Sequence, residues 1–238
     1  MTGRSGDPMN AANDIRGAIF DVDGTLVDSY DAHFIAWRDT LADEGIDYGL
    51  EAFKRDFGRR NPEIIGELWA LEGRDPPAAS TIERIAKRKE THFRTLIAQA
   101  FPEMPGAAHL MRSLRAAGWK VAVGSSAPRS NVALSIELLG TGDVTDVAVS
   151  GEDVERGKPE PDVFLRAAEL LGIEPARCIV IEDANPGIEA AHRAGMPAVA
   201  IASKGRTRAE LAAAELVIDS LEEINPDRLA TISKEHAP

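Results

Sequence analysis

Cysteine is almost absent from the 238-residue sequence, and the one residue present, Cys178, cannot form an internal disulfide. It begins an apolar run, 178–181, so we expect a buried structural thiol there rather than a nucleophile. Aromatic residues are also few, at 5%, but 44% of the residues are hydrophobic, which is sufficient for a packed core. The composition predicts a globular protein of one or two domains without disulfides.

Long apolar segments are missing as well. No run approaches the roughly 20 residues that cross a bilayer, and residues 1–13 lack the apolar centre of a signal peptide. We therefore expect a cytoplasmic protein that has a flexible N-terminal tail at residues 1–13 and no membrane partner.

Positive charge is scarce, because 27 Lys and Arg stand against 39 Asp and Glu, and the formal net charge is −12. Non-specific binding to nucleic acid or to anionic membranes depends on basic surface that neutralises phosphates, so neither partner is expected. A small anionic substrate is not excluded. Local positive potential could come from Arg59, Arg60, Lys89, Arg129 and Lys158.

The hydrophobic pattern first predicts a strand and then a helical region. Residues 15–19 form an apolar strand, and from residue 30 the apolar residues follow a helical period. The expected helices are 30–41, 50–57, 62–71 and 80–100. Ser80-Thr81-Ile82-Glu83 has the form of a capping box, which predicts the start of the last of these helices.

From residue 106 onward, helices alternate with short strands rich in Val and Ile. We expect helices at 106–117, 130–139, 161–171 and 187–194, and strands at 120–124, 144–149, 178–181, 198–201 and 216–218. This alternation predicts an α/β fold whose parallel sheet is covered on both faces. Active groups of such sheets lie at the carboxyl ends of the strands.

Two carboxylates follow the first expected strand, in Asp21-Val22-Asp23-Gly24. Side chains alternate along an extended chain, so Asp23 reaches the same site as Asp21 only if the chain turns, which Gly24 permits. Converging carboxylates repel one another unless a cation or a shared proton relieves them. An oxygen-rich cluster suits Mg²⁺. We interpret the segment as part of a catalytic metal site; the alternative is an acidic turn without chemistry.

The segment 21–29, Asp-x-Asp-Gly-Thr-Leu-x-Asp-Ser, resembles the first motif of the haloacid dehalogenase (HAD) superfamily of aspartate-nucleophile phosphotransferases. Three further segments resemble the later motifs of that family in the same order: 121–126, 157–164 and 179–196. The resemblance implies a Rossmann-like parallel-sheet core, the HAD fold, with an inserted α-helical cap like that of the β-phosphoglucomutase-like branch. We predict a core domain at 14–29 and 104–238 and a cap at 30–103.

The resemblance also implies roles for particular residues. Asp21 would attack phosphorus and form an aspartyl-phosphate, while Asp23 would protonate the leaving alcohol and later deprotonate water. Lys158 would neutralise Asp21 and bind the transferring phosphoryl group. Mg²⁺ would be held by Asp21, Asp183 and the backbone carbonyl of Asp23, and by Glu182 directly or through water.

Ser125 aligns with the phosphate-binding Ser or Thr of the family. Its hydroxyl, with Ser126 and the neighbouring backbone N–H groups, could hold phosphoryl oxygens. An apolar strand followed by two serines is common, so a purely structural role is the alternative. Ala127 and Arg129 stand where known mutases carry small polar side chains that touch the phosphate.

Three residues of the expected cap are candidates for substrate contact. His33 lies twelve residues after Asp21, the spacing of a cap-hinge histidine in β-phosphoglucomutases, although a lone His beside an apolar stripe is usually structural. Lys89 lies within the apolar stripe of its helix, where an ammonium group must snorkel or meet an anion. Arg60 belongs to the segment 58–61, Gly-Arg-Arg-Asn, which matches the place of a cap specificity loop, but the Ser-Arg-x-x-Ser pattern of true mutases is absent.

These features predict a Mg²⁺-dependent hydrolase of a small phosphomonoester, in our interpretation a sugar or polyol phosphate. β-Phosphoglucomutase is the alternative, which His33 and Lys89 favour and which Ala127, Arg129 and the cap loop disfavour. A phosphonate-cleaving relative would need a Schiff-base lysine, for which Lys54 is a candidate. A non-catalytic protein that binds a phosphorylated metabolite is a further alternative. The sequence leaves the oligomeric state open.

Overall fold

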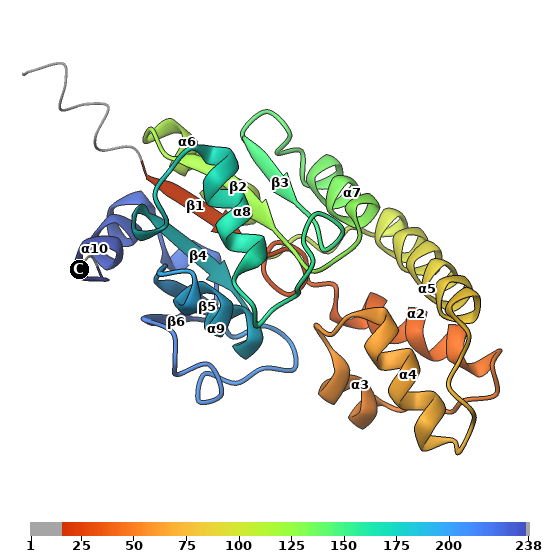
Figure 1. The fold of residues 1–238 in the computed structure, drawn as a ribbon. Helices are drawn as coiled ribbons and strands as arrows, with labels where there is room; N and C mark the ends of the chain where they lie inside the picture. The colour runs from red at the N-terminus through yellow and green to blue at the C-terminus, as the bar shows by residue number, and fades with distance from the viewer. Residues whose placement is uncertain (1–15, 237–238) are drawn as a thin grey trace, which may run out of the picture.

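A single parallel sheet of six strands forms the centre of the computed structural model, which describes residues 16–236 (Figure 1). The strand order is β3-β2-β1-β4-β5-β6. The strands are β1 (Gly17–Phe20), β2 (Lys120–Gly124), β3 (Val147–Val149), β4 (Cys178–Glu182), β5 (Ala198–Ile201) and β6 (Leu216–Ile218). The predicted parallel α/β fold is confirmed, while the tail predicted at 1–13 lies outside the described residues.

Strand β1 lies between β2 and β4, and its register fixes which residues leave the sheet together. Phe20, the last residue of β1, is paired with Val123 on one side and with Ile181 on the other. All four residues of β1 are buried, as expected for a strand covered on both faces. The residues that follow β1, β2 and β4 therefore emerge side by side at one edge of the sheet.

The two faces of the sheet are covered by different helices, because alternate side chains of β1 point to opposite faces. Ala18 and Phe20 belong to a core cluster with α6 (Ala107–Ala116), α7 (Arg129–Leu139) and α10 (Pro226–His236). Ile19 belongs to a second cluster with α8 (Asp162–Leu171) and α9 (Asn185–Arg193). Two short 3₁₀ helices, η2 (Pro175–Arg177) and η3 (Leu221–Glu223), complete the described elements beyond β2.

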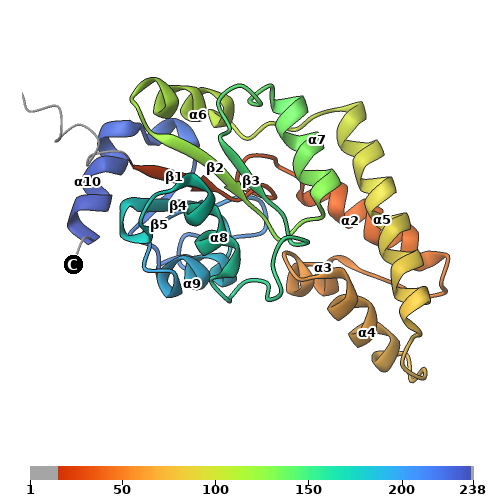
Figure 2. The same cartoon turned by 45° about the horizontal axis from the view of Figure 1, so that its top comes forward.

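A helical insertion separates β1 from the rest of the sheet-forming chain. It consists of α2 (Tyr30–Ala42), α3 (Leu50–Asp56), α4 (Asn61–Leu71) and α5 (Ala79–Gln99), and it has an apolar cluster of its own that includes Trp37, Phe53 and Ile85. The C-terminal half of α5 runs beside α7, as Figure 2 shows, and Phe93 packs into the first core cluster of the sheet. The insertion therefore lies against the edge at which β1 and β4 end.

Two linkers join the insertion to the sheet, and they are hydrogen-bonded to each other. The backbone N–H of Asp28 donates to the carbonyl of Pro102 at 2.8 Å, and the N–H of Met104 donates to the carbonyl of Leu26 at 3.0 Å. Val27 and Glu103 form an antiparallel bridge between them. The entering and leaving chains thus form one paired connection.

The structure differs from the sequence-based expectations at several element ends. The capping box predicted at Ser80 is wrong: α5 begins at Ala79, its N-cap residue is Ala78, and no side chain caps it. The strand predicted from residue 144 begins only at Val147, because the N–H groups of residues 144 and 145 bond to the carbonyl of Thr141 in a turn. Helix α10 was not predicted. The domain boundaries stay a prediction.

None of the helices within residues 16–236 combines the length and apolarity needed to span a membrane.

Leu41→Ala is expected to lower the free energy of unfolding by about 2–5 kcal/mol, the range for buried Leu to Ala changes, because Leu41 is fully buried in the cluster of the insertion. Leu71→Ala is the matched control, since Leu71 is 66% exposed at the end of α4 and surface changes stay within about 0.5 kcal/mol. Urea unfolding followed by circular dichroism measures both. Equal losses in the two variants would contradict the packing described for the insertion.

Candidate active site

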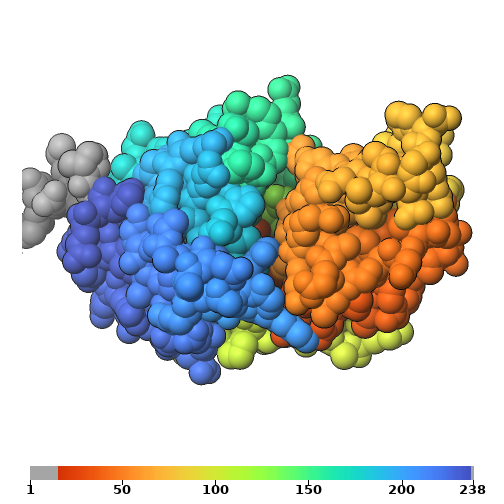
Figure 3. All heavy atoms as spheres, turned by 90° about the horizontal axis from the view of Figure 1, so that it is seen from below, coloured from red at the N-terminus to blue at the C-terminus, as the bar shows by residue number. Residues whose placement is uncertain are grey.

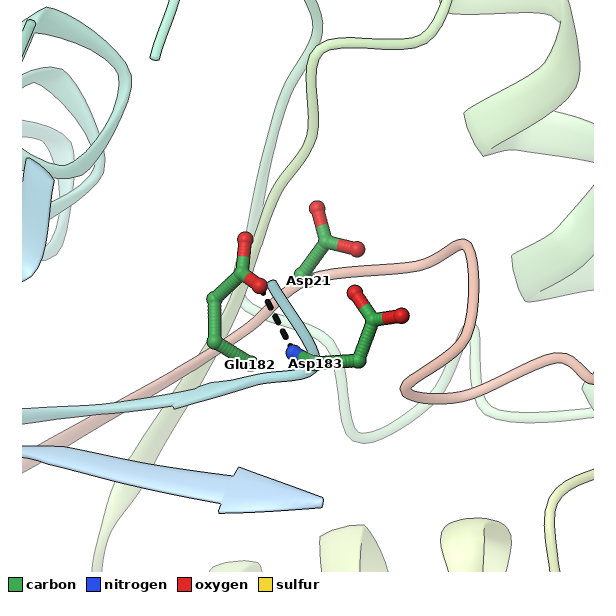
Figure 4. Close-up of side chains that lie close together, drawn as sticks. All are labelled: Asp21, Glu182 and Asp183. Atoms are coloured by element: carbon green, nitrogen blue, oxygen red, sulfur yellow. Dashed lines mark hydrogen bonds between the residues drawn. The ribbon is translucent and has the colours of Figure 1, made fainter. Parts of the chain in front are cut away.

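Three carboxyl groups converge where β1 and β4 end (Figure 4). Asp21 directly follows β1, Glu182 is the last residue of β4, and Asp183 follows it. The backbone N–H of Asp21 donates to the carbonyl of Ile181 at 2.9 Å, which continues the ladder between the two strands. One oxygen of each carboxyl group lies within 4.8 Å of the others, and all three residues are buried. The structure thus brings together three of the residues predicted to bind metal.

The ammonium group of Lys158 lies between two of these carboxylates. Its Nζ donates to Oδ1 of Asp21 at 2.6 Å and to Oε1 of Glu182 at 2.7 Å. It also lies 4.7 Å from the ring centroid of Phe164, a cation–π contact. Burial alone would lower the pKa of Lys158, but the two carboxylates outweigh it and raise the pKa above its usual value. Lys158 therefore keeps its positive charge next to Asp21.

Glu182 is held by donors on both of its oxygens. Besides the Lys158 contact on Oε1, its Oε2 accepts from the backbone N–H groups of Asp183 at 2.6 Å and Ala184 at 2.7 Å. Gly187 is required beside it, because a Cβ atom there would lie 1.8 Å from Oε1 of Glu182. The Glu182 carboxylate is therefore fixed in position by the start of α9.

The turn after β1 lies against Asp183. Gly24 has φ of +82°, and a Cβ atom at this position would lie 2.1 Å from Oδ2 of Asp183. A side chain at Gly24 is thus excluded both by backbone conformation and by space. The same Oδ2 accepts a hydrogen bond from the hydroxyl of Ser203 at 2.9 Å.

Asp23 is the predicted site residue whose side chain faces the insertion rather than the carboxylate cluster. Its Oδ1 lies 2.9 Å from Nε2 of His33. Burial alone would raise the pKa of Asp23, but the contact with His33 and the nearby Lys89 lower it to about 2. Of Asp23, only the backbone carbonyl was predicted to bind metal, and the orientation of the side chain agrees with that restriction.

The carboxylate cluster carries more negative charge than Lys158 compensates. Burial, and then the charges of Glu182 and Asp23, raise the pKa of Asp21 to about 7 despite the opposing effect of Lys158. Burial and the neighbouring Glu182 and Asp21 carboxylates raise the pKa of Asp183 as well. A bound divalent cation would remove this repulsion, and clustered carboxylate oxygens are its preferred ligands. The residues present therefore fit a hard divalent metal ion.

A cavity of about 380 Å³ lies between this cluster and the helical insertion. The cleft between the two parts of the molecule is visible in Figure 3. Ser125 and Ser126, which follow β2, line the cavity together with Asp21 and Lys158, so the predicted phosphate-binding serines are brought to the site. Ser125 is fixed there, since its N–H donates to the carbonyl of Val149 at 3.0 Å and its Oγ accepts from the N–H of Ala127 at 3.1 Å.

The predicted cap residues His33 and Lys89 line the other side of the cavity. Nζ of Lys89 lies 2.8 Å from Nδ1 of His33 and donates to Oε1 of Glu90 at 2.8 Å. The sequence analysis expected the Lys89 ammonium either to snorkel or to meet an anion, and in the structure it meets the carboxylate of Glu90. The ring of His33 also stacks on Phe93, with 3.8 Å between centroids.

Arg60 and Arg206 also line the cavity. Arg60 donates through Nη1 to the carbonyl of Glu155 at 3.2 Å, and its buried Nη2 has no hydrogen-bond partner within residues 16–236. Arg206 donates through Nη2 to the carbonyl of Phe57 at 3.2 Å, and its buried Nε has no partner in the same described part of the chain. Each arginine therefore bonds across the cleft, one from the insertion and the other from the loop after β5.

Two other cations considered from the sequence lie away from the cavity. Arg129 is 67% exposed and pairs with Asp153. Lys54 pairs with Glu51 on the surface, and neither Arg129 nor Lys54 is among the lining residues. This position of Lys54 disfavours the phosphonate-cleaving alternative.

Among the residues that line the cavity, Glu90, Asn131 and Arg206 were not considered from the sequence, while Asn61 was considered only as part of the segment 58–61. None of the first three belongs to a motif. Glu90 is the neighbour of Lys89, and a second buried charge beside the first was the one signal available for it.

A family model described as haloacid dehalogenase-like hydrolase matches residues 15–195. The chain belongs to this family. The predicted family and the predicted class of hydrolytic enzyme are thereby confirmed. Divalent cations are general cofactors of HAD hydrolases, which agrees with the carboxylate cluster at Asp21.

Similar proteins include both phosphatases and a mutase. The chain is 37% identical to 5-amino-6-(5-phospho-D-ribitylamino)uracil phosphatase of Arabidopsis thaliana over 88% of its own length and 55% of the length of that protein. It is 33% identical to hexitol phosphatase A of Escherichia coli over 88% and 93% of the two chains. β-Phosphoglucomutase from Clostridium difficile shares the fold with a TM-score of 0.84 and 25% identity, over 93% and 98%.

Mg²⁺ is expected to raise the thermal midpoint of unfolding, because a ligand that binds only the folded state stabilises it, by about 2.7 kcal/mol at 100 times its Kd. Asp183→Asn, which removes a charge from the cluster, is expected to lose most of the increase. Asp143→Asn is the control, since this carboxylate is 68% exposed and outside the cavity. Differential scanning fluorimetry measures the three proteins. A thermal midpoint of the wild-type protein that does not change with Mg²⁺ would argue against the metal site.

Proposed function

We propose that this HAD hydrolase is a Mg²⁺-dependent phosphatase that hydrolyses a small sugar or polyol phosphate through an aspartyl-phosphate. The observation that carries the proposal is the buried Asp21 carboxylate, bonded to Lys158 at 2.6 Å and facing the cavity beside Asp183. A carboxylate nucleophile needs both a cation that neutralises the incoming phosphate and a fixed position. Lys158 supplies both.

Mg²⁺ would be held by Asp21, Asp183 and the backbone carbonyl of Asp23. It would supply positive charge that screens Asp21 from the phosphate dianion. Glu182 already has protein donors on both oxygens, so we assign it a role in holding Lys158 and a contact with the metal through water. Ser125 and Ser126 would bind phosphoryl oxygens at the end of β2.

In the first half-reaction a carboxylate oxygen of Asp21 bonds to phosphorus as the ester oxygen leaves, and Asp23 gives that oxygen a proton. In the second, water attacks the phosphorus of the aspartyl-phosphate, Asp23 takes the proton of the water, and Asp21 is released. The low pKa keeps Asp23 deprotonated, which is the form that takes the proton of water in the second step. A bound phosphate dianion nearby favours the protonated form that the first step requires.

A sugar or polyol phosphate agrees with the cavity and with the relatives. The names of two relatives specify a hexitol phosphate and a phosphoribityl compound, both phosphates of hydroxyl-rich carbon chains. Amide side chains of Asn61 and Asn131 line the cavity and can bond hydroxyl groups. The mutase alternative is favoured by His33 and Lys89, but Arg129 points away from the cavity and Ala127 offers no side-chain donor.

Asp21→Asn is expected to abolish phosphate release by several orders of magnitude, because an amide of nearly the same size cannot form the aspartyl-phosphate. Asp28→Asn is the matched control, as this carboxylate belongs to the same segment but is exposed. Release of inorganic phosphate from a panel of sugar and polyol phosphates measures both. More than a few per cent of wild-type activity in a folded Asp21→Asn protein would contradict the assignment of Asp21 as the nucleophile. Interconversion of β-glucose 1-phosphate and glucose 6-phosphate that outpaces release would favour the mutase instead.

Asp23→Asn is expected to slow aspartyl-phosphate formation strongly for a polyol phosphate and only weakly for p-nitrophenyl phosphate, whose leaving group needs no proton. Single-turnover phosphate transfer with the two substrates measures the difference. His33→Asn serves as a comparison that leaves the Asp23 carboxylate in place. An equal drop for both substrates in Asp23→Asn would exclude the general-acid role.

A further inference from the structure

Five of the polar side chains that line the cavity belong to the helices α2, α4, α5 and α7 rather than to the ends of the strands. We call this group the roof; it consists of His33, Asn61, Lys89, Glu90 and Asn131. The roof is where the end of the substrate distant from the reacting phosphate would lie. Its charge, together with that of Arg60 and Arg206, which also line the cavity, therefore bears on which chemical group that end can carry.

Glu90 is fixed in the roof by three donors from different elements. Its Oε1 accepts from Lys89 on α5 and from Nδ2 of Asn61 at the start of α4, both at 2.8 Å. Its Oε2 accepts from Nδ2 of Asn131 on α7 at 2.5 Å. Only 6% of the residue is exposed. Burial would raise the pKa of Glu90, but the charge of Lys89 and the hydrogen bonds from Lys89 and Asn61 lower it, so the carboxylate stays charged.

The ammonium of Lys89 already has two acceptors, Nδ1 of His33 and the Glu90 carboxylate. An ammonium group has no acceptor, so in its 2.8 Å contact with His33 the Nδ1 atom must accept. The proton of the ring is then on Nε2, which donates to Asp23. The Lys89 ammonium is thus paired with the Glu90 carboxylate, and the His33 ring with the carboxylate of Asp23. Within the described chain the roof has no surplus positive charge.

We propose that Glu90 determines substrate specificity by excluding a second anionic group from the roof, so that the enzyme takes phosphomonoesters whose distal end is an uncharged, hydroxyl-bearing group. This inference rests on the proposed phosphatase function and narrows its substrate class. A distal phosphate or carboxylate would meet a fixed buried carboxylate, and like charges in a water-excluded site repel strongly.

A hydroxyl group, in contrast, fits the bonding capacity that remains. A carboxylate offers about four acceptor positions, of which Lys89, Asn61 and Asn131 occupy three. One position on Glu90 is left for a substrate O–H. The second N–H of either amide side chain can donate to a hydroxyl oxygen.

The test compares two esters that differ only at the far end: sorbitol 6-phosphate, which ends in CH₂OH, and 6-phosphogluconate, which ends in a carboxylate. We expect wild-type kcat/KM to favour sorbitol 6-phosphate by about tenfold or more, the scale of one like charge in a shielded site. Glu90→Gln is expected to reduce that ratio about tenfold. The reduced ratio should result from a higher kcat/KM for 6-phosphogluconate.

A second variant separates the charge of Glu90 from its contacts. In the Glu90→Gln background, Asn131→Asp returns a carboxylate to the same hydrogen-bonded pair of residues. In the wild-type structure Arg94 donates to Oδ1 of Asn131 at 2.9 Å, and it can pair with the new carboxylate in the same way. We expect the preference for sorbitol 6-phosphate to return. Glu83→Gln is the control, because Glu83 is an exposed carboxylate on the same helix and does not line the cavity.

Wild-type enzyme that hydrolyses 6-phosphogluconate as well as sorbitol 6-phosphate overturns the inference, even if Glu90→Gln does not fold. A Glu90→Gln protein that loses activity equally on both esters also overturns it and leaves Glu90 a structural residue. In both cases the wild-type enzyme still releases phosphate, so the proposed phosphatase stands. If the wild-type enzyme releases phosphate from neither ester but still hydrolyses p-nitrophenyl phosphate, both the proposed substrate class and this inference are wrong.

Discussion

The ion pair of Lys158 with Asp21 and Glu182 is the interaction on which the site depends. Adjacent parallel strands end in three buried carboxyl groups, and a buried charge without a partner costs several kcal/mol. The lysine comes from the loop before α8 and is directed by its contact with Phe164. One cation from a distant segment thus allows β1 and β4 to end in the acidic residues that the chemistry requires.

Space around these carboxylates is set by two glycines. Gly24 and Gly187 approach Asp183 and Glu182 so closely that a methyl group at either position would overlap a carboxylate oxygen. The acids are thereby packed against backbone rather than against side chains that could rotate. The close backbone contacts hold these carboxylates near one another, although their mutual repulsion alone would separate them.

The sequence predicted correctly those elements and site residues that are marked by short contiguous patterns. The strands at 120–124, 198–201 and 216–218 were found at the predicted residues, because short apolar runs between turns are a local signal. Asp21 and Asp183 were found together because both follow buried strands. Glu90, Asn131 and Arg206 were missed, since each acts through partners far away in the chain, and no local pattern encodes such contacts. The supposed capping box failed because α5 starts one residue before Ser80.

The paired linkers at Asp28 and Pro102 restrict how the helical insertion can move. Two independent single-chain connections would let a lid tilt and twist in several directions. Here the entering and leaving chains are hydrogen-bonded to each other, at Asp28 to Pro102 and at Met104 to Leu26, so they must bend together. The paired linkers thus form a single hinge, and a rotation about it would move the roof toward or away from the same edge of the sheet.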